Sequence, residues 1–126
     1  MESEQNNLVL GLDLDGVITE FPDVFRQLTH CWPGRVVVIT VRKDSEKASR
    51  DVIACGIRFD EIVLVSSFAE KVQVVRDRNV ALYLDDQPEM LRGMPGGTAT
   101  GLIRNAGNFD FSEGRWIMSD LTCRLV

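Results

Sequence analysis

An apolar run that ends on two carboxylates constrains this chain more than any other feature of the sequence. Residues 8–14 are aliphatic except for Gly11 and Asp13. Asp15 comes two positions after Asp13, and Gly16 follows at once. A short apolar run bounded by a turn signal is typical of a strand buried in a parallel sheet. Because ligands bind beyond the carboxyl ends of such strands, we expect the two acids to lie where a hard cation can be held.

Two further apolar runs end in the same way. Residues 36–39 precede Thr40, and residues 80–84 precede Asp85 and Asp86. Ordinary turn chemistry accounts for each of these loops separately, but not for the pattern that they share. The three strand ends therefore predict one functional site at one edge of a sheet.

Strand-like and helix-like segments alternate along most of the chain. We expect strands at 8–14, 35–40, 60–65, 80–84 and 98–104, and helices at 22–32, 46–55, 68–79 and 88–92. This alternation predicts an α/β fold: a doubly wound, Rossmann-like parallel sheet of about five strands, with helices on both faces. The 126 residues suffice for a single domain, with 1–7 as a frayed terminus. In the tail, residues 115–118 fit either a strand or a short helix.

Composition excludes some classes of function. The net charge of −5 argues against a general nucleic-acid binder, which would present a basic face. No leader precedes the first strand and no apolar run approaches about 20 residues, so we expect a cytoplasmic protein without membrane contact.

Cys31, Cys55 and Cys123 show no CxxC spacing and are expected to be free, buried thiols. His30 is the only histidine, and we expect it to be structural.

Four short motifs resemble, in order and spacing, the signature motifs of the haloacid dehalogenase (HAD) superfamily of hydrolases. The motifs are Asp13-Leu14-Asp15-Gly16-Val17, Thr40, Lys71 and Asp85-Asp86. The first resembles the DxDG(V/T) signature and is fairly specific, whereas Thr40 and Lys71 mean little individually. The likeness covers residues 8 to about 105, which is most of the chain.

The resemblance implies a magnesium-dependent phosphomonoester hydrolase, a HAD-type phosphatase that works through an aspartyl-phosphate. Asp13 would be the nucleophile. Asp15 would protonate the leaving oxygen and then activate water. Thr40 would hydrogen-bond a phosphoryl oxygen, and Lys71 would neutralise the nucleophile and the phosphate. The Mg²⁺ ligands would be Asp13, Asp15 through its backbone carbonyl, Asp85 and Asp86.

Simpler interpretations of these side chains stay open at this point. Thr40 also fits a β-branched strand residue without a function. Lys71 also fits a solvated lysine on a charged helix. Arg42 fits either a contact with a substrate anion or an ordinary surface arginine. The aromatic side chains Trp32, Tyr83 and Trp116 are expected to pack in the core or at its edge.

The spacing leaves no room for a cap domain, which many members of the superfamily insert after the first motif or between the second and third. An open site of this kind favours a large substrate that exposes a phosphoryl group, or a homo-oligomer in which a neighbouring subunit covers a phosphorylated small molecule. The turn at 19–22 is the only local candidate for a lid.

Two other functions compete with hydrolysis. The first is a catalytically inactive HAD-fold module that binds phosphate or metal. The second is a phospho-acceptor receiver domain, which also combines clustered acids, a threonine and a lysine. The receiver is disfavoured because the middle strand here ends on Thr40, where a receiver places its acceptor aspartate.

Overall fold

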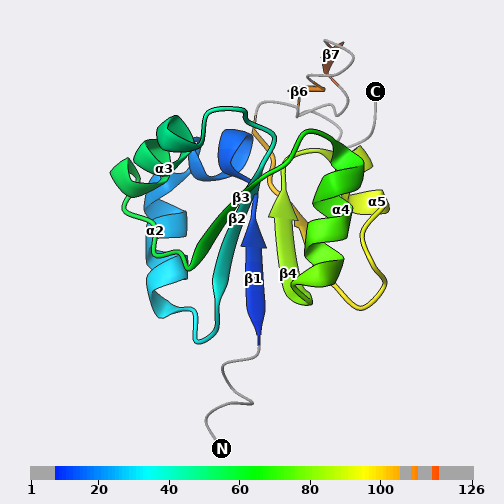
Figure 1. Cartoon of the computed structure of the whole chain (residues 1–126), viewed down its shortest axis with the longest axis horizontal. Helices are drawn as coiled ribbons and strands as arrows, with labels where there is room; N and C mark the ends of the chain where they lie inside the picture. The colour runs from blue at the N-terminus through cyan, green and yellow to red at the C-terminus, as the bar shows by residue number, and fades with distance from the viewer. Residues whose placement is uncertain (1–7, 106–108, 111–114, 117–126) are drawn as a thin grey trace, which may run out of the picture.

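The computed structural model describes residues 8–105, 109–110 and 115–116. Five parallel strands form one sheet in the order β3-β2-β1-β4-β5, which confirms the predicted α/β fold (Figure 1). The strands are β1 (Val9–Leu12), β2 (Val36–Thr40), β3 (Glu61–Leu64), β4 (Val80–Asp85) and β5 (Ala99–Leu102). No cap domain interrupts the alternation of strands and helices within the described residues.

Helices cover both faces of the sheet, as predicted. Figure 1 shows α2 (Pro22–Cys31) and α3 (Ser45–Ala54) on one side, and α4 (Phe68–Asp77) and the short α5 (Pro88–Arg92) on the other. Two of the helices begin at side-chain caps: Asp44 Oδ1 accepts a bond of 3.1 Å from the backbone N of Lys47, and Ser67 Oγ accepts one of 3.2 Å from the backbone N of Glu70. The helices α2 and α5 begin with a proline instead. These local signals explain why the predicted and observed helix starts nearly coincide.

The core has two halves, one on each face of the sheet. Val36 and Val38 of β2 pack with β1, α2 and α3, whereas Val37 and Ile39 pack with β4, α4 and α5. Successive side chains of a strand point to opposite faces. Since both faces are covered, every residue of β2 is buried, and this is why the sequence shows a continuous apolar run without alternation.

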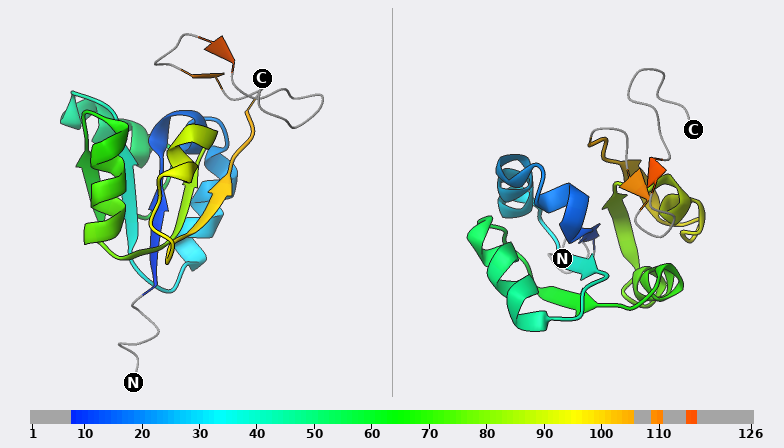
Figure 2. Two further views of the ribbon diagram at one scale, coloured as in Figure 1. Left: turned by 90° about the vertical axis from the view of Figure 1, so that its right-hand side faces the viewer. Right: turned by 90° about the horizontal axis from the view of Figure 1, so that it is seen from above.

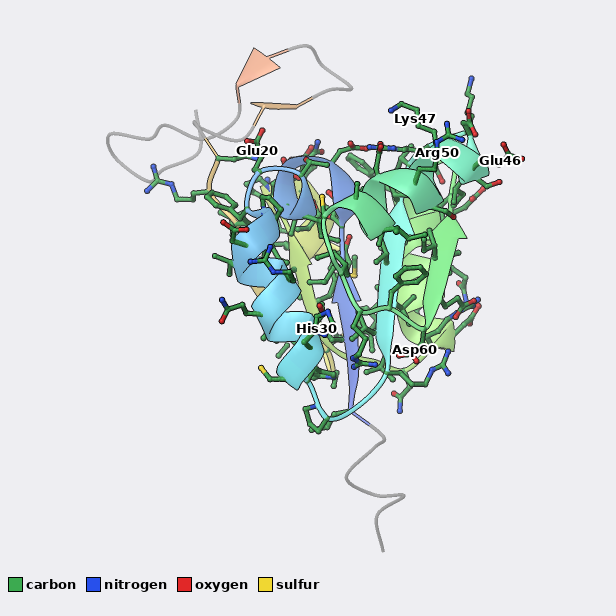
Figure 3. All side chains as sticks on the ribbon, turned by 90° about the vertical axis from the view of Figure 1, so that its left-hand side faces the viewer. Glu20, His30, Glu46, Lys47, Arg50 and Asp60 are labelled. Atoms are coloured by element: carbon green, nitrogen blue, oxygen red, sulfur yellow. The ribbon has the colours of Figure 1, made fainter. Side chains whose placement is uncertain are left out.

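The outer surface of α3 is charged. Glu46, Lys47 and Arg50 project from this helix away from the sheet (Figure 3). No helix among the described residues is long and apolar enough to cross a membrane.

The cysteines correct one prediction. Cys31 is exposed and Cys55 is only half-buried, and both are free thiols. They lie at the carboxyl ends of α2 and α3, just before the chain returns to the sheet as β2 and β3. Cys123 lies outside the described residues. His30 Nε2 is 3.0 Å from the carbonyl oxygen of Gly56, a contact between helix ends that fits its expected structural role.

Two of the three aromatic side chains singled out in the sequence lie in the described part, where they pack as expected. Tyr83 is fully buried, and Trp32 is half-buried against the core, with its Nε1 donating a hydrogen bond of 2.9 Å to the carbonyl of Leu8. The side chain of Trp116 lies outside the description. In the tail, β7 (Arg115–Trp116) pairs antiparallel with β6 (Phe109–Asp110), so the backbone at 115–116 is a strand.

The strand order places the candidate site. From β1 the chain continues outward to β2 and β3, then crosses back to β4 on the other side of β1 and continues to β5. All five strands point to the same edge of the sheet (Figure 2). The order reverses between β1 and β4, and ligands of open α/β sheets bind in the crevice at such a point. Leu12 pairs with Leu84, so the residues that follow, Asp13 and Asp85, are neighbours at that crevice.

Candidate functional site

The loop after β1 is a tight turn that requires glycine. In η1 (Leu14–Ile18), Asp15 has φ −76° and ψ 127°, and Gly16 has φ 87° and ψ −10°. These angles define a type II turn, whose third residue needs a positive φ. A Cβ atom on Gly16 would also overlap the Oδ2 oxygen of Asp86. The turn therefore brings the backbone of the first motif directly against the acidic motif that follows β4.

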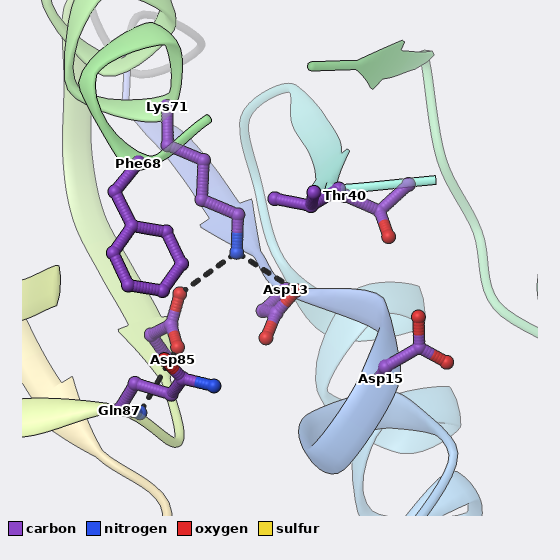
Figure 4. A pocket seen from close by; sticks show the side chains of 8 residues that line it. Asp13, Asp15, Thr40, Phe68, Lys71, Asp85 and Gln87 are labelled. Atoms are coloured by element: carbon purple, nitrogen blue, oxygen red, sulfur yellow. Dashed lines mark hydrogen bonds and ion pairs between the residues drawn. The ribbon is translucent and has the colours of Figure 1, made fainter. Parts of the chain in front are cut away.

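A buried lysine joins two of the predicted carboxylates. Lys71 Nζ lies 2.9 Å from Asp13 Oδ1 and 3.0 Å from Asp85 Oδ2 (Figure 4). Its side chain is only 4 % exposed, because Lys71 and Val75 lie one turn apart on the buried face of α4. The alternative of a solvated lysine is therefore wrong.

Three carboxylates gather beside this lysine. Asp13, Asp85 and Asp86 are all buried, and each offers an oxygen within 4.8 Å of the others. If all were ionised, these groups and the Lys71 ammonium would carry a net charge of −2, from three negative charges and one positive. Carboxylate oxygens are the ligands that hard divalent cations prefer. The cluster could therefore hold one such ion, and its charge would then balance.

Asp85 accepts hydrogen bonds at both of its carboxylate oxygens. Its Oδ2 oxygen accepts a hydrogen bond of 2.5 Å from the hydroxyl of Tyr83 in addition to that from Lys71, and its Oδ1 oxygen accepts one of 3.0 Å from the backbone N of Gln87. Tyr83 is thus both a core residue and an anchor for the site. Sequence reasoning assigned it only the first role.

The electrostatic environment of the cluster resists negative charge. Burial raises the pKa of Asp13 well above its usual value, although the charge of Lys71 opposes the shift. Burial and the neighbouring Asp85 raise the pKa of Asp86 to about 6, against a hydrogen bond from Asn105 that lowers it. Burial lowers the pKa of Lys71, but the charges of Asp13 and Asp85 and their hydrogen bonds outweigh this, so its pKa lies above the usual value. Lys71 is therefore cationic, and a bound cation would stabilise the ionised carboxylates.

Asn105 ties the two acidic loops together. Its Nδ2 donates a hydrogen bond of 2.6 Å to the carbonyl of Gly16 and one of 3.1 Å to Asp86 Oδ2. Sequence reasoning missed this residue. A signal was present, because Asn105 is the first residue after the predicted strand at 98–104 and so continues the pattern of polar side chains at strand ends.

A buried hydroxyl without a partner faces the same pocket. Thr40 is fully buried, and its Oγ1 forms no hydrogen bond within the described part of the chain. It lines a pocket of about 510 Å³ together with Asp13, Asp15, Val41, Phe68, Lys71, Asp85 and Gln87. An unpaired buried hydroxyl costs free energy. The orphaned Oγ1 therefore suits an oxygen-rich ligand that supplies the missing partner.

The Asp15 side chain lies apart from the carboxylate cluster. Its two oxygens accept hydrogen bonds of 2.9 and 2.7 Å from Nε and one terminal nitrogen of Arg42, and Figure 4 shows the carboxylate turned away from Lys71. The other terminal nitrogen of Arg42 donates a bond of 2.6 Å to Asp51 of α3. Hydrogen bonds to Asp15 are the main cause of a raised pKa of Arg42, and the bond from Arg42 lowers the pKa of Asp51. Arg42 is thus no free surface residue: it orients Asp15 at the pocket wall.

The structure groups the predicted site residues in two sets. Asp13, Lys71, Asp85 and Asp86 form the buried centre. Thr40 and Asp15 line the same pocket from another side. The turn at 19–22, the candidate lid, is largely exposed and contributes no residue to the pocket lining within the described part of the chain.

Comparisons with known proteins give no further guidance for this site. The chain matches no model of a known protein family, and no curated protein matches it significantly. The functional interpretation therefore depends on the chemistry of the residues themselves.

Proposed function

We propose that this chain is a magnesium-dependent phosphomonoester hydrolase of HAD type that acts through a phosphoryl group carried on Asp13. One observation carries the proposal. The same pocket contains a carboxylate paired with a buried ammonium and, facing them, the orphaned hydroxyl of Thr40. Phosphoryl transfer needs this combination of a positioned nucleophile and groups that neutralise the phosphoryl oxygens.

The acidic cluster fits the metal of this proposal. Asp13, Asp85 and Asp86 would hold Mg²⁺ through their carboxylates, and the resemblance to the superfamily adds the backbone carbonyl of Asp15. When bound, the ion would offset the repulsion between the attacking carboxylate and the phosphate dianion. Its charge of +2 would cancel the net charge of −2 on the ionised cluster.

Asp13 is oriented for attack by two hydrogen bonds to one oxygen. Its Oδ1 accepts bonds of 2.9 Å from Lys71 Nζ and 2.9 Å from the backbone N of Leu14, so we assign the attack to Oδ2. A bond forms between Oδ2 and phosphorus, and the bond from phosphorus to the ester oxygen breaks. Thr40 donates its free hydroxyl hydrogen to a phosphoryl oxygen as the phosphoryl group moves. Lys71 balances the charge on Asp13 throughout.

Asp15 would move the protons. It would give a proton to the departing ester oxygen, and then take one from the water that attacks phosphorus and releases Asp13. In the structure both Asp15 oxygens are bonded to Arg42. Protonation of Asp15 removes the negative charge that Arg42 binds, so the pair must weaken whenever Asp15 carries the proton.

This pairing also favours a second candidate, a non-catalytic module that binds phosphate or metal. In that case Arg42 would hold Asp15 permanently, and ligands would bind without turnover. The two candidates differ in one observable, which is the release of inorganic phosphate.

The experiment compares the wild type with Asp13→Asn, using 4-nitrophenyl phosphate and a panel of phosphorylated metabolites with excess Mg²⁺. We expect phosphate release by the wild type and a loss of about 1000-fold or more in the variant, since a nucleophile is removed. Asp23→Asn is the matched control, because that carboxylate is 85 % exposed on α2. Full activity of Asp13→Asn with native circular dichroism would refute the nucleophile. Binding of Mg²⁺ and phosphate by the wild type without any release would favour the module.

A further inference from the structure

A groove opens beside the pocket that contains Asp13 and Thr40, at the same edge of the sheet. We call that first pocket the phosphoryl pocket. The groove has a volume of about 480 Å³, within the range of small-molecule sites. Its lining comes from the ends of β2 and β3 and from the first turn of α4, and consists of Val41, Arg42, Lys43, Leu64, Val65, Ser66 and Glu70. Val41 lines both this groove and the phosphoryl pocket, so the two adjoin at this residue.

We propose that this groove holds the leaving group, and that the substrates are phosphate monoesters whose alcohol portion presents an apolar, ring-sized face. The proposal rests on the proposed function and adds the substrate class to it.

The position of the groove supports the assignment. Thr40 donates to the phosphoryl group in the proposed reaction, and Val41 is the next residue, with its Cα atom about 3.8 Å away. A general acid must lie within hydrogen-bond reach of the leaving oxygen. The general acid assigned here is Asp15, and the side chain that holds it, Arg42, lines the groove. The ester oxygen therefore lies between the pocket and the groove, and the rest of the alcohol extends into the groove.

The wall of the groove indicates what kind of group it accepts. Val41 is 45 % exposed although the strand before it is fully buried, and the half-buried Leu64 adds to the apolar surface. Two of the three charged side chains in the lining are hydrogen-bonded, whereas Lys43 is exposed and forms no ion pair within the described residues. Arg42 is bonded to Asp15 and Asp51, and Glu70 accepts bonds of 2.9 and 2.7 Å from the backbone N and hydroxyl of Ser66. The exposed aliphatic wall favours an apolar face, and Lys43 adds one cation to the lining.

Val41→Ala tests the proposal, with 1-naphthyl phosphate and acetyl phosphate as substrates and Mg²⁺ in excess. The naphthyl ring offers two apolar faces to the wall of the groove, whereas the acetyl group offers a single methyl. We expect kcat/KM for 1-naphthyl phosphate to fall about tenfold, the low end for a lost hydrocarbon contact in a pocket. For acetyl phosphate kcat/KM should change less than about twofold on the same reasoning. Val24→Ala is the matched control, since Val24 is 60 % exposed on α2 and lines neither cavity; it should leave both values unchanged.

The outcomes separate this proposal from the one on which it rests. If Val41→Ala lowers kcat/KM equally for both substrates, or for neither, the leaving-group assignment is overturned. Phosphate release by the wild type would still support the hydrolase in that case. A wild type that hydrolyses neither substrate would overturn both proposals. If Val41→Ala does not fold, Val41→Thr replaces it, since threonine keeps the shape and exchanges one methyl group for a hydroxyl. A loss confined to 1-naphthyl phosphate is again the supporting result.

Discussion

Replacing Asp86 by asparagine should stabilise the protein when no metal is present. The pKa of Asp86 is about 6 in the folded chain, against 3.8 for an unperturbed carboxyl group. The difference of about 2 pKa units corresponds to about 3 kcal/mol of free energy that disfavours the ionised folded form. Asparagine has nearly the same shape, keeps an oxygen acceptor for Asn105 and removes the charge. Asp86→Asn should therefore raise the free energy of unfolding by up to about 3 kcal/mol near pH 8.

The sign of the pH dependence follows from the raised pKa. Below about pH 4, Asp86 is protonated in both the folded and the unfolded chain and contributes nothing. Between about pH 4 and pH 6 the unfolded chain loses this proton first, so the wild type loses stability as the pH rises. Above about pH 6 the loss is complete. The difference in stability between Asp86→Asn and the wild type should thus grow over this interval and then stay level.

Magnesium should narrow the difference in stability between the two proteins. An ion at 100 times its dissociation constant stabilises the folded state by about 2.7 kcal/mol, nearly the cost of keeping Asp86 ionised. The variant lacks one of the three carboxylates and should gain less.

Thermal unfolding followed by circular dichroism tests this reasoning at about pH 4 and pH 8, each with a chelator and with excess Mg²⁺. The expected gain of the variant with chelator near pH 8 is roughly 10 °C in Tm. Asp23→Asn, which removes an exposed carboxylate, is the control and should not change with pH in this way. A metal-free Asp86→Asn that is less stable than the wild type near pH 8 would refute the buried-charge argument.

Three further substitutions test other parts of the site. Thr40→Val removes a buried hydroxyl without a partner, so it should raise the free energy of unfolding measured in urea by about 1 kcal/mol. The same variant should lower kcat/KM for phosphate esters about tenfold or more. A loss of stability would contradict the orphaned hydroxyl. Gly16→Ala should lower the free energy of unfolding by about 1–3 kcal/mol, because φ is 87° and the new Cβ atom meets Asp86. An unchanged free energy of unfolding in urea would argue against the turn geometry. Asn105→Ala should weaken Mg²⁺ binding about tenfold or more in calorimetry, since the bond that orients Asp86 is lost; an unchanged affinity would remove Asn105 from the site.

Local sequence patterns predicted the secondary structure closely, because each element depends on neighbouring residues. The predicted helix at 88–92 has the observed bounds of α5, and the predicted strand at 35–40 differs from β2 by one residue. The strand predicted at 8–14 is too long, since the chain already leaves the sheet at Asp13 to enter the turn. Hydrophobic runs show which segments are buried, but they do not show where a buried strand gives way to a buried turn.

The candidate site could be predicted in part. The ends of β1, β2 and β4 pointed to Asp13, Thr40 and Asp85, because parallel strands present their carboxyl ends at one edge. Lys71 could be predicted as the partner of Asp13 only through the resemblance of the motifs, and two other contacts of the site could not be predicted. Arg42 binds Asp15 across 27 positions, and Asn105 binds the carbonyl of Gly16 across 89. Such pairs depend on side-chain directions that no local pattern contains.

The sequence alone therefore determined the class of the fold and the edge of the sheet where chemistry can occur, since hydrophobic runs and polar strand ends are properties of short segments. Only the tertiary structure decided that β4 lies beside β1, that Lys71 is buried between two carboxylates, and that Asp15 is held apart from them by Arg42. The physical reason is that strand order and ion pairing are settled by packing between segments far apart in the chain, where burial makes each charge depend on its neighbours in space.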